Sequence, residues 1–373
     1  MTQIFDHLQI SGYRGFDVIN LSELGQVNIF VGNNNSGKTS LLEIISILCN
    51  PLDPFRWIEV SQRRLSLGRT PIAFRADLEA IKWIFPQTIG FAHNLSHQGT
   101  MFVKSSGGSP LQEIQAKLGE IYSVGLEKSS QENPNDDLTL SEPESETEGV
   151  NSGVELEVSV VQKDSLFPEW KEVFQFWDKE RFVQRKRNKP IVKNATIFPS
   201  YSSSEPILNH LSQIILQKPE SKNEVLELIQ SFDKNILDLE ILTTPKATLY
   251  IKHQELGFAP LYVFGDGFKL TLAIALNLLT IADGVLLVDE IETSIHVSAL
   301  SRIFSWLIEA CHRLNIQLFV TTHSLEAIDA MLKPEIAIED VVAFRLNAKG
   351  QAPQRFSGDL LHRLRSERGL DVR

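Results

Sequence analysis

Residues 27–40 read VNIFVGNNNSGKTS, an apolar run that ends in a glycine-rich turn and leads into a segment that reads as a helix over 39–48. The turn fits the pattern G-x-x-x-x-G-K-[ST] at Gly32–Thr39. In such a turn the backbone amides and the N-terminus of the following helix attract a phosphate chain. The stretch therefore predicts an α/β fold with a phosphate-binding loop.

Every residue of this loop, and the residue after it, is expected to contact a nucleotide. The set is Gly32, Asn33, Asn34, Asn35, Ser36, Gly37, Lys38, Thr39 and Ser40. Lys38 is expected to reach the β- and γ-phosphates and to act in catalysis, and the Thr39 hydroxyl is expected to ligate Mg²⁺. The implied cofactors are ATP and Mg²⁺.

Residues 284–290 read GVLLVDE, an apolar run that ends in two carboxylates. The pattern predicts a buried central strand that delivers both acids to its carboxyl end. Asp289 is expected to hold Mg²⁺, directly or through water, and Glu290 to polarise the attacking water. Taken alone, such a strand end is more often a plain exit to the surface, but its pairing with the phosphate loop favours the functional interpretation.

Residues 318–324 read LFVTTHS, a third apolar run that ends in a histidine. His323 lies 33 positions after Glu290, one predicted helix later. The two strands can therefore be neighbours in a parallel sheet, which would place His323 near the γ-phosphate as a polar switch that senses ATP. A lone histidine is otherwise more often a structural residue.

These three motifs, together with LQISGYRGF at 8–16, resemble the ABC-type ATPases of the SMC and RecF superclass. The closest likeness is to the AAA-domain branch of the overcoming-lysogenization-defect (OLD) nucleases and the Septu-type anti-phage ATPases. It covers roughly 1–60 and 234–345. The resemblance implies a homodimer, or a higher homo-oligomer, that closes around ATP, with Arg14 near the nucleotide.

In that family a glycine-rich signature at a helix N-terminus binds the γ-phosphate of the partner subunit's ATP. The matching segment reads FGDGFK at 264–269, and the expected contacts are Gly265, Asp266 and Gly267. Gly265 stands where the family usually has a serine, although backbone amides can still bind phosphate. An ordinary glycine turn before a buried helix is the alternative.

Two further family elements have candidates in this sequence. Glu292–His296 corresponds to the D-loop, which crosses the dimer interface, and Val297 stands where a proline is usual. The Q-loop glutamine has two candidates, Gln62 and Gln87.

The fold class predicted is α/β, a P-loop NTPase of ABC-ATPase type that is split by a large mixed α+β insertion with a short helical hairpin. Lys38 and Asp289 are 251 positions apart, so we expect a head at 1–60 and 234–373 around a lobe at 61–233. The lobe shows no sustained heptad repeat. Within it, the patterns predict a helix over 111–121 and a hairpin of helices over 205–233.

The net charge of −11 is concentrated in one segment. Residues 127–149 hold eight acids and one lysine, a contribution of 1 − 8 = −7, and are predicted to form a disordered loop. Residues 179–193 hold seven basic residues and one acid. Arg185, Lys186 and Arg187 are therefore candidates for a nucleic-acid contact, and a solvated helix end is the alternative.

Composition excludes several classes of protein. Two cysteines, Cys49 and Cys311, exclude a disulfide framework and favour the reducing cytoplasm. The apolar tract 270–288 is interrupted by polar residues, so it reads as a buried helix and strand, and no membrane segment or secretory signal is expected. Fifty residues follow His323, too few for the Toprim domain of OLD nucleases, so no intrinsic nuclease is predicted.

The function predicted is that of an ATPase that regulates a nucleic-acid-processing or anti-phage effector, a nuclease or toxin carried on a separate polypeptide. One alternative is a slow nucleotide-sensing scaffold that holds such an effector inactive. Another is a RecF-like DNA repair ATPase. A transporter subunit is disfavoured by the split head and the unusual signature.

Overall fold

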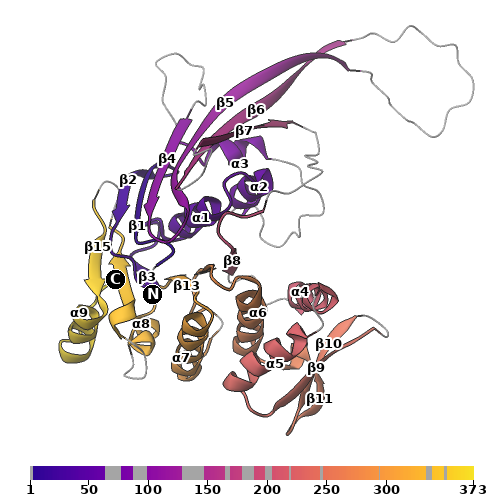
Figure 1. The fold of residues 1–373 in the computed structure, drawn as a ribbon, viewed down its shortest axis with the longest axis vertical. Helices are drawn as coiled ribbons and strands as arrows, with labels where there is room; N and C mark the ends of the chain where they lie inside the picture. The colour runs from indigo at the N-terminus through magenta and orange to yellow at the C-terminus, as the bar shows by residue number, and fades with distance from the viewer. Residues whose placement is uncertain are drawn as a thin grey trace, which may run out of the picture.

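The computed structural model describes residues 3–63, 77–86, 99–127, 147–163, 169–178, 189–197, 204–217, 220–243, 247–293, 295–332, 338–347 and 351–373. These residues form a head built on a mostly parallel sheet, and a second, antiparallel sheet lies above its N-terminal helices (Figure 1). The predicted contacts Arg185, Lys186 and Arg187, the glutamine Gln87 and most of the acidic segment 127–149 lie outside the described residues.

The central sheet has the order β15-β14-β3-β13-β12-β8. All neighbouring strands are parallel except β15, which is antiparallel to β14. The strands are β3 (Val27–Val31), β8 (Asn194–Ile197), β12 (Val285–Val288), β13 (Gln317–Thr321), β14 (Val341–Arg345) and β15 (Gln354–Ser357). The strand that leads to His323 lies directly beside the acidic strand, as predicted, and it separates that strand from the phosphate-loop strand.

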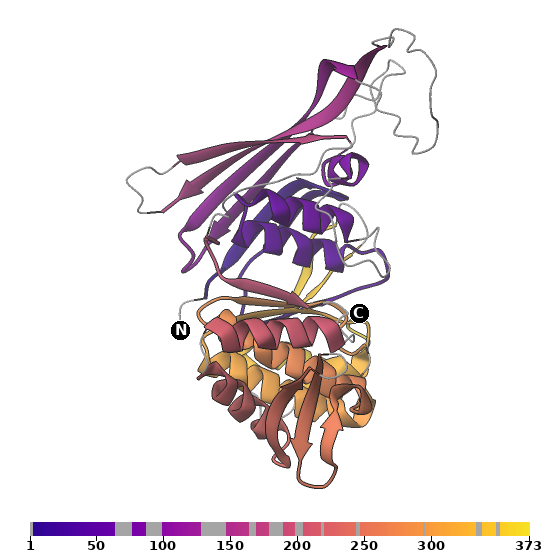
Figure 2. The ribbon, with the colours of Figure 1, turned by 90° about the vertical axis from the view of Figure 1, so that its right-hand side faces the viewer.

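The core strands are apolar along their whole length because both faces of the sheet are covered. Phe30, Leu287 and Phe319 pack on one side with α1 (Lys38–Cys49) and α2 (Pro54–Gln62). The alternate residues pack on the other side with α6 (Asp266–Thr280), α7 (Val297–Arg313) and α8 (Leu325–Met331). Figure 2 shows α1 and α2 between the two sheets.

The antiparallel sheet has the order β2-β1-β4-β5-β6-β7. Its strands are β1 (His7–Tyr13), β2 (Phe16–Leu21), β4 (Gly99–Ser106), β5 (Leu111–Glu127), β6 (Thr147–Gln162) and β7 (Glu169–Trp177). The N-terminal strands β1 and β2 thus join strands of the predicted lobe instead of the phosphate-loop strand. α3 (Leu78–Lys82) packs against α2.

The helix predicted over 111–121 is wrong, because these residues lie in β5. Leu111, Ile114 and Leu118 are all buried at the three- and four-residue spacing of a helix face. The cause is a bulge: Leu111 pairs with Gln162, but Glu113 pairs with Val161. The extra residue shifts the alternation of buried and exposed side chains by one position. The buried residues of this strand therefore have the spacing expected of one face of a helix.

The head also contains residues that the sequence analysis assigned to the lobe at 61–233. β8 is the edge strand of the central sheet beside β12. The predicted pair of helices is present as α4 (Ser204–Gln217) and α5 (Ser221–Phe232). Both helices pack on α6, and the Trp306 indole of α7 donates to the carbonyl of Leu228 in α5 at 2.8 Å. A strand of four residues carries too weak a periodic signal to be placed from sequence.

A small sheet and a C-terminal segment complete the head. The small sheet has the order β11-β10-β9, with β9 (Ile236–Leu242), β10 (Thr248–His253) and β11 (Gly257–Pro260), and the 3-10 turn η2 (Leu261–Val263) leads from it into α6. The C-terminal segment holds η3 (Ile338–Asp340), α9 (Gly358–His362) and the π-helical turn η4 (Arg363–Glu367).

The apolar tract 270–288 is divided between α6 and β12, as predicted. Over the described residues, no helix combines the length and the hydropathy that crossing a membrane requires. Cys49 and Cys311 are both buried free thiols, and burial raises the pKa of Cys49 to about 12.

One buried glutamine fastens the N-terminal segment to the central sheet. Gln317, at the start of β13, is 1% exposed. Its amide oxygen accepts from the Phe5 amide at 2.9 Å, and its nitrogen donates to the carbonyls of Phe5 and Gly25 at 2.8 and 2.9 Å. A buried polar group of this kind stabilises only while each of its partners is satisfied.

We therefore expect Gln317→Leu to lower the free energy of unfolding by about 2–4 kcal/mol, because the buried amide and carbonyl of Phe5 lose their partner and the Gly25 carbonyl keeps only its bond from Asn28. Urea unfolding should show a lower midpoint with an unchanged slope. Gln9→Leu, at an exposed position of β1, is the control and should change stability little. Equal midpoints for Gln317→Leu and the wild type would contradict this account.

Candidate functional site

The phosphate loop connects β3 to α1 through two glycines that no other residue can replace without strain. Gly32 and Gly37 have φ values of 144° and 96°. A Cβ on Gly37 would also lie 2.5 Å from the Phe16 ring. The loop is therefore shaped by glycine conformation and by close packing against β2.

Lys38 begins α1 and is buried within the loop. Its Nζ donates to the carbonyls of Gly32 and Asn33 at 2.8 and 2.9 Å. Burial lowers the pKa of Lys38, and the charges of Asp289, Glu290 and Glu292 oppose that shift. The ammonium thus lies at the centre of the loop, within the electrostatic field of the acidic strand.

Thr39 and Asp289, 250 positions apart, are in direct contact. The Thr39 hydroxyl donates to Asp289 Oδ2 at 3.0 Å and to Oδ1 at 3.3 Å. Asp289 is only 8% exposed. A hydroxyl and a carboxylate beside a phosphate loop are the hard oxygen donors that Mg²⁺ prefers, so the residues present fit this ion.

Thr321 is a site residue that the sequence analysis missed. Its hydroxyl donates to Asp289 Oδ1 at 2.6 Å and accepts from the Glu290 amide at 2.8 Å. It ends β13, the strand between β3 and β12. The only sequence signal was a threonine directly after an apolar run. Whether such a threonine reaches the acidic residues depends on which strands are neighbours, and the sequence does not show this.

Glu290 follows Asp289 with a left-handed backbone, φ 45°. This conformation is costly for a glutamate and is retained only where neighbouring bonds support it. The bond from its amide to Thr321 supports it on one side. The Thr293 hydroxyl lies 3.4 Å from Glu290 Oε2 on the other.

The predicted switch His323 lies in the loop after β13, at the same edge of the sheet. Its amide donates to Glu292 Oε1 at 2.7 Å, so the loops that follow β12 and β13 are joined. The next residue, Ser324, caps α8 by accepting from the Ala327 amide at 3.0 Å. His323 is thus the last residue before a capped helix.

The guanidinium of Arg14 is engaged away from the phosphate loop. Arg14 Nε pairs with the fully buried Glu43 of α1 at 2.8 Å, and Nη2 donates to the Val60 carbonyl at 3.3 Å. Burial lowers the pKa of Arg14, but Tyr13 and Glu43 raise it, and the net shift is upward. This geometry gives Arg14 a positioning role in the β1–β2 turn, and its contact with a nucleotide stays a prediction.

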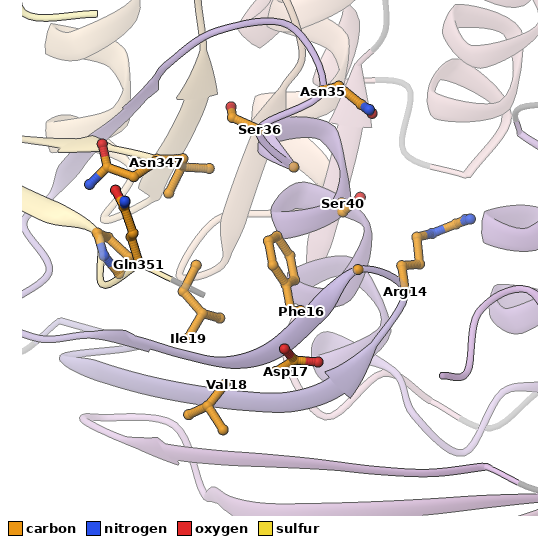
Figure 3. Close-up of a pocket in the computed structure, with 14 residues that line it drawn as sticks. Arg14, Phe16, Asp17, Val18, Ile19, Asn35, Ser36, Ser40, Asn347 and Gln351 are labelled. Atoms are coloured by element: carbon orange, nitrogen blue, oxygen red, sulfur yellow. The ribbon is translucent and has the colours of Figure 1, made fainter. Parts of the chain in front are cut away.

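A cavity of about 260 Å³ lies beside the phosphate loop. It is bounded by the β1–β2 turn, by residues 35–40, by 346–347 and by 351 and 353. Arg14 is among its lining residues, and the Arg14 side chain extends away from Asn347 and Gln351 (Figure 3). Phe16 supplies an aromatic ring, and Asn347 and Gln351 supply two amides. None of these three was singled out in the sequence, because the segments that carry them are distant along the chain.

The signature candidate forms an exposed helix N-terminus. Gly265 is the N-cap of α6, and the position that a Cβ would take there faces open space, with no atom beyond its chain neighbours within 4 Å. Lys269 pairs with Asp266 at 2.9 Å. Over the described residues, the hydrogen bonds of 265–267 stay within α6.

The D-loop candidate leads into α7. His296 accepts from the Ser298 amide at 3.3 Å as the N-cap of that helix, and Val297 is 61% exposed. Gln62 ends α2, and the Q-loop assignment stays a prediction.

Comparison with known proteins gives a family and several relatives. A family model described as "AAA domain, putative AbiEii toxin, Type IV TA system" matches residues 119–329, more than half of the chain. An "ATP/GTP phosphatase" of Helicobacter pylori is 23% identical over 87% of this chain and 86% of its own. An uncharacterized protein of Methanocaldococcus jannaschii is 33% identical over 29% of this chain and 98% of its own.

Among solved structures, the SMC head domain of Thermotoga maritima covers 95% of this chain and 98% of its own, with a TM-score of 0.42 and 12% identity. The Smc head of Pyrococcus furiosus, bound to the C-terminal domain of ScpA, covers 98% and 99%, with a TM-score of 0.46 and 9% identity. The fold of this chain is a P-loop α/β fold with insertions.

We expect Thr321→Val to lower the free energy of unfolding by about 2–3 kcal/mol, because the valine cannot donate to a buried carboxylate or accept from the Glu290 amide. Thr321→Ser keeps the hydroxyl and should retain most of that stability. Urea unfolding of the three proteins tests the expectation. A valine variant as stable as the wild type would show that Thr321 does not hold Asp289.

Proposed function

This chain belongs to the AAA-domain family described above, and we propose that it binds ATP with Mg²⁺ and hydrolyses it at the carboxyl edge of its central sheet. The observation that carries the proposal is the contact of Thr39 with Asp289 at 3.0 Å. That contact unites the phosphate loop and the acidic strand in one site. Thr39 and Asp289 would hold Mg²⁺, and when bound this ion would supply positive charge that offsets the charge developing on the transferred phosphoryl group.

The residues around this contact have distinct roles. The amides of the loop and the N-terminus of α1 hold the phosphates, and Lys38 adds a positive charge that the buried site does not screen. Glu290 is the general base that accepts a proton from the attacking water. Thr321 positions both acids through its two bonds, and His323 senses the γ-phosphate.

The cavity beside the loop holds the base and ribose. The Phe16 ring offers an apolar face for a purine, and the amides of Asn347 and Gln351 can each donate and accept hydrogen bonds. Such amides can read the edge of adenine or of guanine. The name "ATP/GTP phosphatase" of the Helicobacter pylori relative agrees with a site that takes either purine.

A second copy of the chain completes the site. The N-terminus of α6 at Gly265–Gly267 is exposed, and its dipole favours an anion. Tyr262 and Val263 beside it are 67% and 58% exposed, which is apolar surface that an interface would cover. A homodimer in which this turn meets the partner subunit's triphosphate would satisfy both features.

The dimer regulates a separate effector, a nuclease or toxin, in nucleic-acid processing or anti-phage defence. Arg185, Lys186 and Arg187 are the proposed nucleic-acid contacts. The nuclease or toxin activity belongs to that separate effector and not to this chain. The second candidate function is a slow nucleotide-sensing scaffold, which the glycine at position 265 favours because it lacks the serine hydroxyl of the usual signature.

Glu290→Gln should reduce ATP hydrolysis by about 100-fold or more, because the amide cannot accept the proton. ATP binding should remain, and light scattering should show a dimer that persists with ATP. Glu309→Gln, at an exposed position of α7, is the matched control. Hydrolysis at the wild-type rate by Glu290→Gln would exclude Glu290 as the base, and slow wild-type turnover with tight binding would favour the scaffold.

Asn347→Ala and Phe16→Ala should each weaken binding of ATP and GTP, with loss of the ring costing about 1–3 kcal/mol of binding free energy. Calorimetry with ATP, GTP and inorganic tripolyphosphate separates the base from the phosphates. Tripolyphosphate affinity should change little in Asn347→Ala, which lies outside the phosphate loop. Unchanged affinity of both variants for ATP would exclude the cavity as the base site.

A further inference from the structure

The backbone of His323 is held from both sides by charged side chains. Its amide donates to Glu292 Oε1 at 2.7 Å, and its carbonyl accepts from Arg373 Nη1 at 2.9 Å. Glu292 belongs to the loop after the acidic strand, whereas Arg373 lies 50 positions further along the chain. The two peptide units that flank the His323 Cα therefore each have a fixed partner.

Arg373 can reach this carbonyl because Asp371 orients its guanidinium. Arg373 Nε and Nη2 lie 3.1 and 2.8 Å from the two oxygens of Asp371. Hydrogen bonds from Arg373 lower the pKa of Asp371. The planar guanidinium of Arg373 donates from two nitrogens to Asp371, and its third nitrogen donates to the His323 carbonyl. A lysine ammonium cannot reproduce this geometry.

The segment that carries Arg373 is itself fastened to α8. Arg365 pairs with both oxygens of Asp329 at 2.7 and 2.8 Å and donates to the Leu370 carbonyl at 2.6 Å. The Leu370 amide donates to the Leu364 carbonyl at 3.0 Å. Val372 is 3% exposed. Most of the segment 363–373 is exposed, and the Arg365–Asp329 pair and the buried Val372 fasten it.

We propose that the segment 363–373 is a strut that positions the γ-phosphate sensor, with Arg373 as a positioning residue for hydrolysis. The inference rests on the proposed function, in which His323 senses the γ-phosphate. Arg373 acts only through the His323 peptide, which limits where the imidazole can lie. Loss of the strut should slow the chemical step and leave nucleotide binding nearly unchanged. The reason is that, within the described residues, the hydrogen bonds and ion pairs of the strut do not include the phosphate loop.

The test measures steady-state ATP hydrolysis by Arg373→Ala, Arg373→Lys and Asp371→Asn. We expect kcat of Arg373→Ala to fall about tenfold, the rate equivalent of one charge-assisted bond, with KM within about twofold of the wild type. Arg373→Lys and Asp371→Asn should be intermediate. Arg355→Ala removes an arginine of the edge strand β15 that pairs with Glu23, and it should match the wild type.

A double-mutant cycle with His323→Ala shows whether Arg373 acts through the sensor. If it does, the double variant hydrolyses ATP no more slowly than His323→Ala alone. A further fall in the double variant, or wild-type kcat in Arg373→Ala with a slow His323→Ala, overturns the strut and leaves the proposed function standing. Wild-type kcat in His323→Ala contradicts the sensor role itself. Should Arg373→Ala fail to fold, Arg373→Lys and Asp371→Asn carry the same cycle.

Discussion

The buried carboxylate of Asp289 is the constraint on which the site depends. A charge that is 8% exposed is costly unless polar groups surround it. It is satisfied here by the hydroxyls of Thr39 and Thr321, from the loop after β3 and the end of β13. Both reach it only because β13 lies between β3 and β12 in a parallel sheet, so all three strands end at one edge. A different strand order would leave the carboxylate buried without partners.

The same edge holds three residues with positive φ values close to the Asp289 carboxylate or the phosphate loop. Glu290 has a positive φ immediately after Asp289, and Gly32 and Gly37 have positive φ values in the phosphate loop. Strain of this kind persists where surrounding bonds hold it, and it commonly marks a functional site. Glu290 is held by Thr321, and the loop is held by Phe16 against Gly37.

Phe16 and Arg14 also connect the site to the antiparallel sheet. Both lie at the β1–β2 turn of the second sheet, in which β1 pairs with both β2 and β4. The Arg14–Glu43 ion pair attaches that turn to α1 directly behind the phosphate loop. Movement of the antiparallel sheet would therefore be transmitted to the cavity through these two residues.

The sequence by itself determined the phosphate loop, the acidic strand, the histidine strand and the α/β class, because each rests on local patterns of apolar residues and glycine. Tertiary structure alone decided that Thr321 bridges the acids, that Arg14 pairs with Glu43, that β8 joins the head and that Arg373 reaches His323. Each of these contacts joins segments that are distant along the chain, so neither spacing nor propensity encodes it. The bulge after Leu111 shows that local patterns can also mislead, because one unpaired residue gives a strand the apolar spacing of a helix.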